Sequence, residues 1–135
     1  MCMNTLDQKI ETILANWKVE EYIAYLYLSI ANADMSIAKT EMDLIHHRLN
    51  HLLQNYFPNV NMDVANLLEN LRTASEMKSD MDRLKIIEAL SKKYRLPLEI
   101  KGQIVSDLLE LVHVDDQMVY SEYRLMHYIE ASFTV

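Results

Sequence analysis

The stretch Ile30–Glu41 reads IANADMSIAKTE, and the stretch Leu111–Glu122, which starts 81 residues later, reads LVHVDDQMVYSE. In each copy an apolar run ends at an aspartate, an apolar residue follows three positions later and a glutamate seven positions later. A longer alignment gives six identical pairs in one register: Ile23/Ile104, Leu28/Leu109, Asp34/Asp115, Glu41/Glu122, Leu44/Leu125 and His46/His127. We interpret this repeat as two related helical hairpins, each with an acidic turn.

The composition favours an all-α protein. Among 135 residues there are one Gly and two Pro, too few for the turns of a sheet protein, while good helix formers are abundant. The length fits one domain with one core. We therefore predict a compact single domain over residues 1–135 with about seven helices, in which the hairpins cover about 20–56 and 97–133.

Apolar periodicity places the helices along the chain. The stripe of the first helix loses phase around Lys18–Glu20, where we expect a break. The apolar stripe of the second helix is Ile23, Leu26, Ile30 and Ala33. The third should stop before Pro58, and Asn59 or Asn61 should cap the fourth. Pro97 fits the first turn of the sixth helix, because the missing N–H costs nothing there.

The net charge of −7 argues against nucleic-acid binding, which needs clustered Lys and Arg. From Gly102 to Tyr123 there is no Lys or Arg, although the segment holds five carboxylates, Asp107, Glu110, Asp115, Asp116 and Glu122. Such a local field would attract a cation or a basic partner surface. The alternative is a solvated acidic face that keeps the protein in solution.

The sequence is typical of a cytoplasmic protein. Its single cysteine, Cys2, permits no intramolecular disulfide and fits a reducing compartment. Charged residues interrupt the N-terminal segment, which therefore does not resemble a signal peptide. The longest stretch of low polarity, Tyr22–Ala33, is too short to span a bilayer. We expect no integral membrane segment.

The paired acidic residues have two interpretations. In the structural one, Glu41 and Glu122 lie near the third position of a helix, where a carboxylate satisfies free N–H groups, and Asp34 and Asp115 bind turn amides. In the functional one, these four carboxylates converge, with Asp116 nearby, as oxygen ligands for Ca²⁺, Mg²⁺ or Mn²⁺. Neither turn has the ligand spacing of an EF-hand.

The pattern A-x-A-D-x-x-I-x-x-x-E of the first turn, with its second copy after two intervening helices, resembles the tellurite-resistance TerB-like family, which includes the N-terminal domain of DjlA-type co-chaperones. The resemblance implies a seven-helix domain without established catalysis, suspected of binding divalent metal through Asp34, Glu41, Asp115 and Glu122. It also implies protein partners in membrane-associated or stress-response complexes. Met35 and Asp116 replace the usual family glycine, so we expect a differently shaped turn.

Histidines offer weaker candidate sites. His47 and His51 lie four residues apart on the polar face of their helix, a spacing that zinc accepts, but exposed histidines without a metal explain the pattern better, because no further ligand can be named. His46 and His127 lie beside apolar faces, so we expect them to be partly buried. Glu110 and His113 have the E-x-x-H spacing of di-iron bundles, yet there is no second copy of that motif.

Two functions follow from these patterns. The first is a non-enzymatic, TerB-like interaction module with an acidic face for a protein partner, in a stress or tellurite-resistance-type response. The alternative is a regulatory domain that binds a divalent cation through the paired turns. We expect no enzymatic activity, because the sequence contains no phosphate-binding loop, nucleophile elbow or activated cysteine.

Overall fold

Helices account for all regular structure in the computed structural model, which describes residues 5–31, 39–58, 63–76, 80–113 and 120–133. This confirms the all-α prediction and the number of helices. The seven helices are α1 (Thr5–Asn16), α2 (Val19–Ala31), α3 (Lys39–Tyr56), α4 (Val64–Glu76), α5 (Asp80–Lys93), α6 (Leu98–His113) and α7 (Tyr120–Phe133).

Most helix boundaries agree with the local signals. The predicted break falls between α1 and α2, and α3 ends before Pro58. The predicted cap of α4 is wrong: the Oδ1 atom of Asp63, rather than Asn59 or Asn61, accepts hydrogen bonds from the backbone N–H groups of Ala65 and Asn66, at 3.1 and 3.4 Å. An aspartate directly before the first helical residue can reach these free donors, whereas a residue further upstream cannot.

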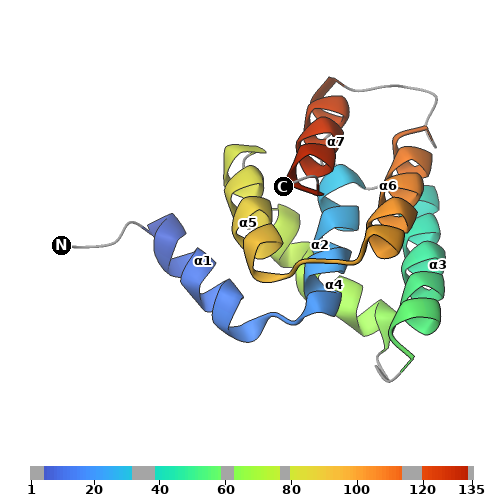
Figure 1. Cartoon of the computed structure of the whole chain (residues 1–135), viewed down its shortest axis with the longest axis horizontal. Coiled ribbons are helices and arrows are strands. Elements are labelled where there is room, and N and C mark those ends of the chain that lie inside the picture. The colour runs from blue at the N-terminus through green and yellow to red at the C-terminus, as the bar shows by residue number, and fades with distance from the viewer. Residues whose placement is uncertain (1–4, 32–38, 59–62, 77–79, 114–119, 134–135) are drawn as a thin grey trace.

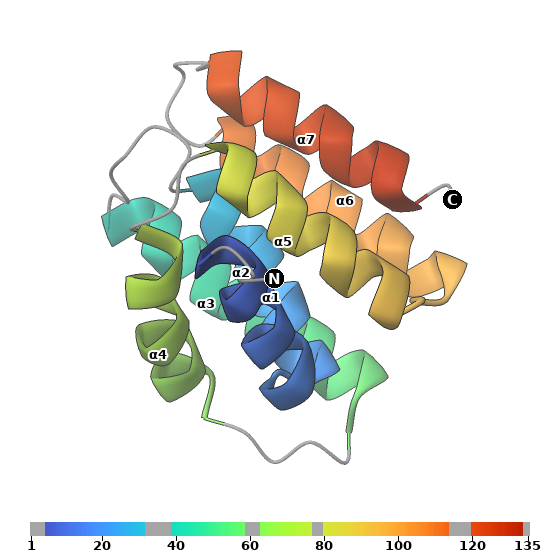
Figure 2. The same cartoon turned by 90° about the vertical axis from the view of Figure 1, so that its left-hand side faces the viewer.

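Helix α2 forms the centre of the molecule. Every residue from Tyr22 to Ile30 is buried, with at most 1% of its surface exposed. The helix packs against α3, α4, α5, α6 and α7, which surround it in Figures 1 and 2. The predicted stripe residues Ile23, Leu26 and Ile30 are buried, while Ala33 lies outside the described residues. The residues between them are buried as well, because a helix that is apolar on all sides is stable only when other elements cover all sides.

The surrounding helices each bury one face. Helix α1 packs on α5 at the edge of the molecule, where its apolar residues are only half-buried. The inner faces of the others follow the predicted helical spacing. They are Ile45, Leu49, Leu52 and Leu53 in α3, Val64, Leu67, Leu68 and Leu71 in α4, Ile86, Ile87 and Leu90 in α5, Ile100, Ile104, Leu108 and Leu111 in α6, and Leu125, Met126, Ile129 and Phe133 in α7.

The two helix pairs that carry the repeated sequence pack reciprocally. Helix α2 of the first pair contacts α7 of the second, helix α6 of the second contacts α3 of the first, and α2 and α6 contact each other. An approximate twofold axis between α2 and α6 would produce this set of contacts. Figures 1 and 2 show that α2 and α6 end, and α3 and α7 begin, at the same end of the molecule. We call this the acidic end, after the two turns that join these helices.

Candidate functional site

Two of the predicted site residues can be located in the fold by their backbone. Glu41 is the third residue of α3, and Glu122 is the third residue of α7. The predicted helical position of both glutamates is therefore confirmed. Asp34, Asp115 and Asp116 lie outside the described residues. A carboxylate in a first helical turn complements the helix dipole, so these positions suit Glu with or without a bound cation.

The electrostatic potential at the acidic end disfavours further negative charge, because two helices end there. The carboxyl end of a helix carries a partial negative charge, and α2 has no basic residue in its last turn. Because α2 and α6 end at the same side of the molecule, two such helix ends contribute to the field there (Figures 1 and 2). A cation or a basic side chain would relieve the negative potential of these two helix ends.

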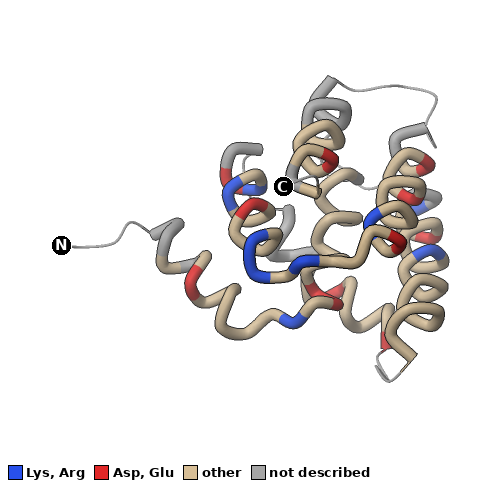
Figure 3. The backbone as a smooth tube through the Cα atoms, in the orientation of Figure 1, with Lys and Arg blue, Asp and Glu red and all other residues tan. Residues whose placement is uncertain are grey.

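An ion pair partly compensates the acidic segment of α6. The Nη2 atom of Arg48, in α3, donates to both carboxylate oxygens of Glu110, in α6, at 2.8 and 2.7 Å. Figure 3 shows basic as well as acidic residues on α3, which packs beside α6. The segment Gly102–Tyr123 lacks cations in sequence, but the fold supplies one from a distant helix. The cation that the charge of this segment was expected to attract is, at Glu110, a side chain of the same chain.

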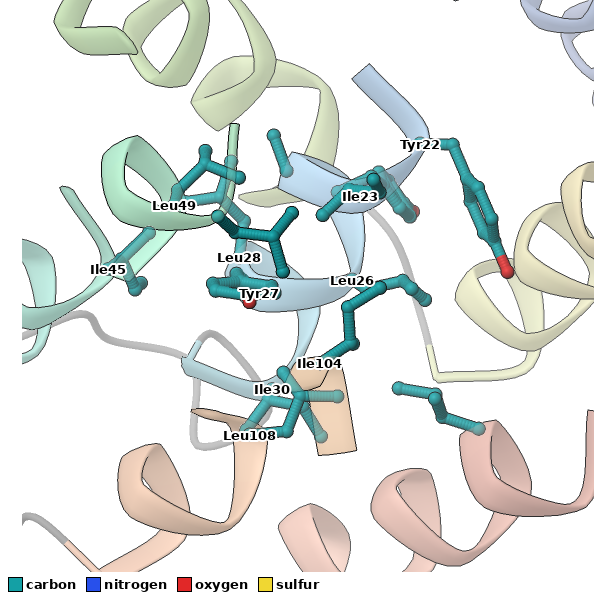
Figure 4. Packing of buried hydrophobic residues seen from close by; sticks show 14 of the residues in the cluster. Tyr22, Ile23, Leu26, Tyr27, Leu28, Ile30, Ile45, Leu49, Ile104 and Leu108 are labelled. Atoms are coloured by element: carbon teal, nitrogen blue, oxygen red, sulfur yellow. The ribbon is translucent and has the colours of Figure 1, made fainter. Parts of the chain in front are cut away.

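Unlike Glu110, which is exposed, Asp107 of the same segment does not face solvent. Its exposed fraction is 1%, and its two oxygens accept separate hydrogen bonds. The Tyr27 hydroxyl donates to Oδ2 at 2.5 Å, and Nε2 of Gln103 donates to Oδ1 at 3.0 Å. Figure 4 shows the Tyr27 ring among Leu28, Ile45 and Leu49. Asp107 thus belongs to the interface of α2 and α6 and contributes nothing to an acidic surface.

The surroundings shift the titration of this buried pair. Burial raises the pKa of the Asp107 carboxyl group, while the hydrogen bonds from Tyr27 and Gln103 and the positive charge of Arg48 act in the opposite direction. Burial, then the Asp107 carboxylate, also raises the pKa of the Tyr27 hydroxyl well above its ordinary range. Tyr27 therefore remains a hydrogen-bond donor at neutral pH. Both oxygens of the carboxylate are occupied, so the pair serves to hold α2 against α6.

The helical periodicity of α6 could have indicated that Asp107 is buried. It lies three residues after Ile104 and four before Leu111, on the apolar face of α6. A carboxylate at such a position must find hydrogen-bond donors inside the core. Tyrosines in the neighbouring central helix are suitable donors, because their hydroxyl groups extend from large apolar rings.

The other tyrosines of α2 also direct polar groups toward neighbouring helices. The hydroxyl group of Tyr22 lies 2.9 Å from Oγ of Ser91 in α5, and its ring stacks on Tyr94 at a centroid distance of 6.2 Å. Burial raises the pKa of Tyr25 to about 12, although the positive charge of Arg83 opposes this shift. Tyr22 and Tyr27 thus give a largely apolar central helix two hydroxyl groups that contact side chains of α5 and α6.

The histidine predictions have mixed outcomes. His47 and His51 are exposed, as their place on the polar face of α3 predicts, and Nδ1 of His51 lies 3.1 Å from Nδ2 of Asn55. The prediction that His46 and His127 are partly buried is wrong, since both are exposed. Each follows a buried residue directly, and one step along a helix turns the side chain by about 100°. Among the described residues no three His, Cys, Asp or Glu side chains are grouped closely enough to hold a metal ion.

Comparisons with known proteins add no family to this description. No protein-family model matches the chain, and neither a characterised protein nor a solved structure matches it. The resemblance to the TerB-like family therefore stays a prediction that rests on the two repeated turns. None of the described helices is both long and apolar enough to cross a membrane.

Proposed function

We propose that this protein is a non-enzymatic, TerB-like interaction module whose acidic end receives a basic segment of a protein partner. One observation carries the proposal: α2 and α6, which both lead into acidic turns, end on the same side of the molecule (Figures 1 and 2). Two negative helix ends and the carboxylates that follow them favour a cationic partner. A stress or tellurite-resistance-type response is the setting that the sequence resemblance favours.

The structure of the core supports a surface function. The carboxylate of Asp107 is enclosed between helices and has both oxygens bonded. Glu110 is tied to Arg48 across the interface of α3 and α6. These two residues support the packing of the helices rather than an acidic surface, and Asp115 and Asp116, which lie outside the described residues, are the carboxylates that we propose for recognition.

A titration with an oligolysine peptide, followed by amide NMR spectra, tests the proposal. We expect shifts in the last turns of α2 and α6 and an affinity that falls as salt is added, because exposed charges are screened within about 10 Å at 0.1 M salt. Changing Asp115→Asn together with Asp116→Asn should weaken binding several-fold. Glu99→Gln is the matched control, since Glu99 is exposed at the opposite end of α6. Equal weakening by the control would contradict an acidic-end site.

A divalent-cation site is the second candidate. The equivalent positions of Glu41 and Glu122, each third in a helix that begins at the acidic end, favour it. With Asp34 and Asp115 these carboxylates would supply the oxygen ligands that Ca²⁺, Mg²⁺ and Mn²⁺ prefer. The ion would bind only the folded chain and so raise the melting temperature.

Thermal melts separate the two candidates. They should be recorded in chelator and then with millimolar Ca²⁺, Mg²⁺ or Mn²⁺. A rise of several degrees that disappears in the double variant Asp34→Asn, Asp115→Asn would support the metal site. If no ion shifts the melt while oligolysine still binds, the acidic end is a protein-docking surface without a metal.

A further inference from the structure

Far from the acidic end, the turn between α5 and α6 gathers basic residues. Lys92 and Lys93 end α5, Arg95 lies in the turn, and Lys101 lies in the first turn of α6. Figure 3 shows these Lys and Arg positions following one another at the end of α5 and into α6. We call these four residues, with Leu98, the basic corner. Such a grouping is notable in a chain whose net charge is −7.

Leu98 projects from this corner into solvent. Its exposed fraction is 85%, and the only other exposed large hydrophobic side chain in the described ranges is Leu109, at 40%. Pro97, directly before it, is exposed as well. Transfer of a leucine side chain out of water is favourable in proportion to the area that is covered. The corner therefore combines one prominent apolar side chain with four cations.

Bonds to other helices hold the corner in place without removing its charge. The ammonium group of Lys93 donates to the carbonyl of Leu14 in α1, and that of Lys101 donates to the carbonyl of Phe133, at 2.7 Å, in α7. These contacts satisfy carbonyl groups near the carboxyl ends of two helices. Because a carbonyl carries no net charge, both lysines remain positive. Lys92 lies 3.3 Å from Glu88 in an ion pair whose side chains are 77% and 52% exposed.

The shape of the basic corner fits an anionic lipid surface better than an acidic peptide. The depression lined by Tyr22, Ser91 and Phe133 leaves about 10 Å³ to the centre of a water molecule, enough to enclose about one water. A peptide segment binds best in a groove that encloses its anchor residues. Here the apolar side chain projects from the protein instead. The interfacial region of a bilayer accepts a projecting leucine, while cations around it meet the anionic headgroups.

We propose that the basic corner binds peripherally to anionic lipid surfaces, with Leu98 inserted among the headgroups and Lys92, Lys93, Arg95 and Lys101 against the lipid phosphates. The acidic end does not prevent this contact. Helix α6, with 16 residues, separates the two ends by about 24 Å. That distance is about three times the screening length of about 8 Å at physiological salt. Glu88 and Glu99 are the carboxylates nearest in sequence, and the four cations outnumber them.

Co-sedimentation of the full chain with vesicles tests this proposal. Vesicles of equal parts phosphatidylcholine and phosphatidylserine should bind the protein, more weakly as salt rises, and phosphatidylcholine alone should bind it far less. Leu98→Ser should reduce the partition coefficient about tenfold through lost apolar contact. Lys92→Gln and Arg95→Gln should each reduce it about fivefold. These two cations are chosen because Lys93 and Lys101 also bond to other helices.

Two matched controls and one competitor make the outcome decisive. Leu109→Ser removes an exposed leucine near the other end of α6, and Lys39→Gln removes an exposed cation at the start of α3. Neither should change the partition coefficient. Equal binding to neutral vesicles, or equal loss in the controls, would overturn the proposal. Binding of a polyglutamate peptide without binding to vesicles would overturn it in favour of an acidic protein segment.

Discussion

The two helix pairs that share a sequence pattern occupy different environments. In α2 the whole stretch Tyr22–Ile30 is buried, whereas α6 buries one face and leaves Leu109 exposed at 40%. The identical pair Leu28/Leu109 shows the difference most directly, because Leu28 has an exposed fraction of 0%. The repeat therefore determines the helices and turns of each pair. The number of helices packed around a residue determines what the same side chain contributes to stability.

The largest difference in stability between the two helix pairs should appear when Leu28→Ala is compared with Leu109→Ala. The first substitution leaves a cavity in the centre of the molecule and should lower the free energy of unfolding by about 2–5 kcal/mol. The second removes a side chain that is only partly covered and should cost less than about 1 kcal/mol. Urea unfolding of both variants measures this difference. Similar midpoints for the two variants would refute the central position of α2.

Substitution of Asp107 should have the next largest effect on stability. The equivalent position in α2 is Leu26, so the first helix pair has no counterpart of this carboxylate. Asp107→Ala leaves the Tyr27 hydroxyl and the Gln103 amide without an acceptor, which should cost about 2 kcal/mol. Tyr27→Phe should cost about 1 kcal/mol. A double-mutant cycle in urea should show that the two losses are not additive. Additive losses would mean that the hydrogen bond contributes little.

The same carboxylate should make stability depend on pH. Its pKa is higher in the folded chain than in the unfolded chain, so the folded state binds more protons between these two values. The wild type should therefore lose stability as the pH rises through that interval, which begins at the ordinary aspartate pKa near 4. Asp107→Asn cannot titrate and should not show this loss. The test is the difference between their unfolding free energies from about pH 4 upward, and a difference that grows in favour of the wild type would contradict the raised pKa.

Glu41→Ala and Glu122→Ala should have smaller and nearly equal effects. Each removes a carboxylate from the third position of a helix and should cost about 1 kcal/mol in chelator, where no divalent ion contributes. Urea unfolding checks both. Unchanged midpoints would reject the capping role and favour metal binding as the reason for these residues. One large and one negligible loss would show that the two pairs are not equivalent here.

The smallest effect on stability should come from the ion pair between Arg48 and Glu110, which the repeat does not contain a second time. Arg48 aligns with Ile129, so nothing in α7 repeats it. The side chains of Arg48 and Glu110 are 33% and 43% exposed, and Glu110→Gln should cost about 0.5 kcal/mol at low salt. The cost should decrease when salt is added. Unfolding at two salt concentrations measures this, and a loss of several kcal/mol would indicate a buried pair instead.

The fold was predictable where the signals are local. Scarce Gly and Pro, apolar stripes and Pro58 were enough to give seven helices and most of their boundaries. The apolar stripe of α2 did not indicate its burial on all sides, although Tyr22–Ile30 contains no charged residue. That absence of charge is itself a sign of a helix without a solvent face.

The candidate site was less predictable, because its charges depend on contacts between distant segments. Nothing near Glu110 in the sequence indicates Arg48, which lies 62 residues away. Asp107 carried a local signal in its apolar spacing, but its donor Tyr27 is 80 residues away. Residue types show which groups carry charge, and only the packing of the helices shows which of these charges remain at the surface.

The central position of α2 has a consequence for synthesis of the chain. This helix is made early, but three of the helices that cover it, α5, α6 and α7, follow after residue 79. A ribosome adding about 5–20 residues per second needs roughly 5–20 seconds to proceed from Ile30 to Phe133. During that time the nine uncharged residues of Tyr22–Ile30 lack part of the helices that cover them in the complete fold. The nascent chain is therefore most prone to aggregate before its last helix is complete.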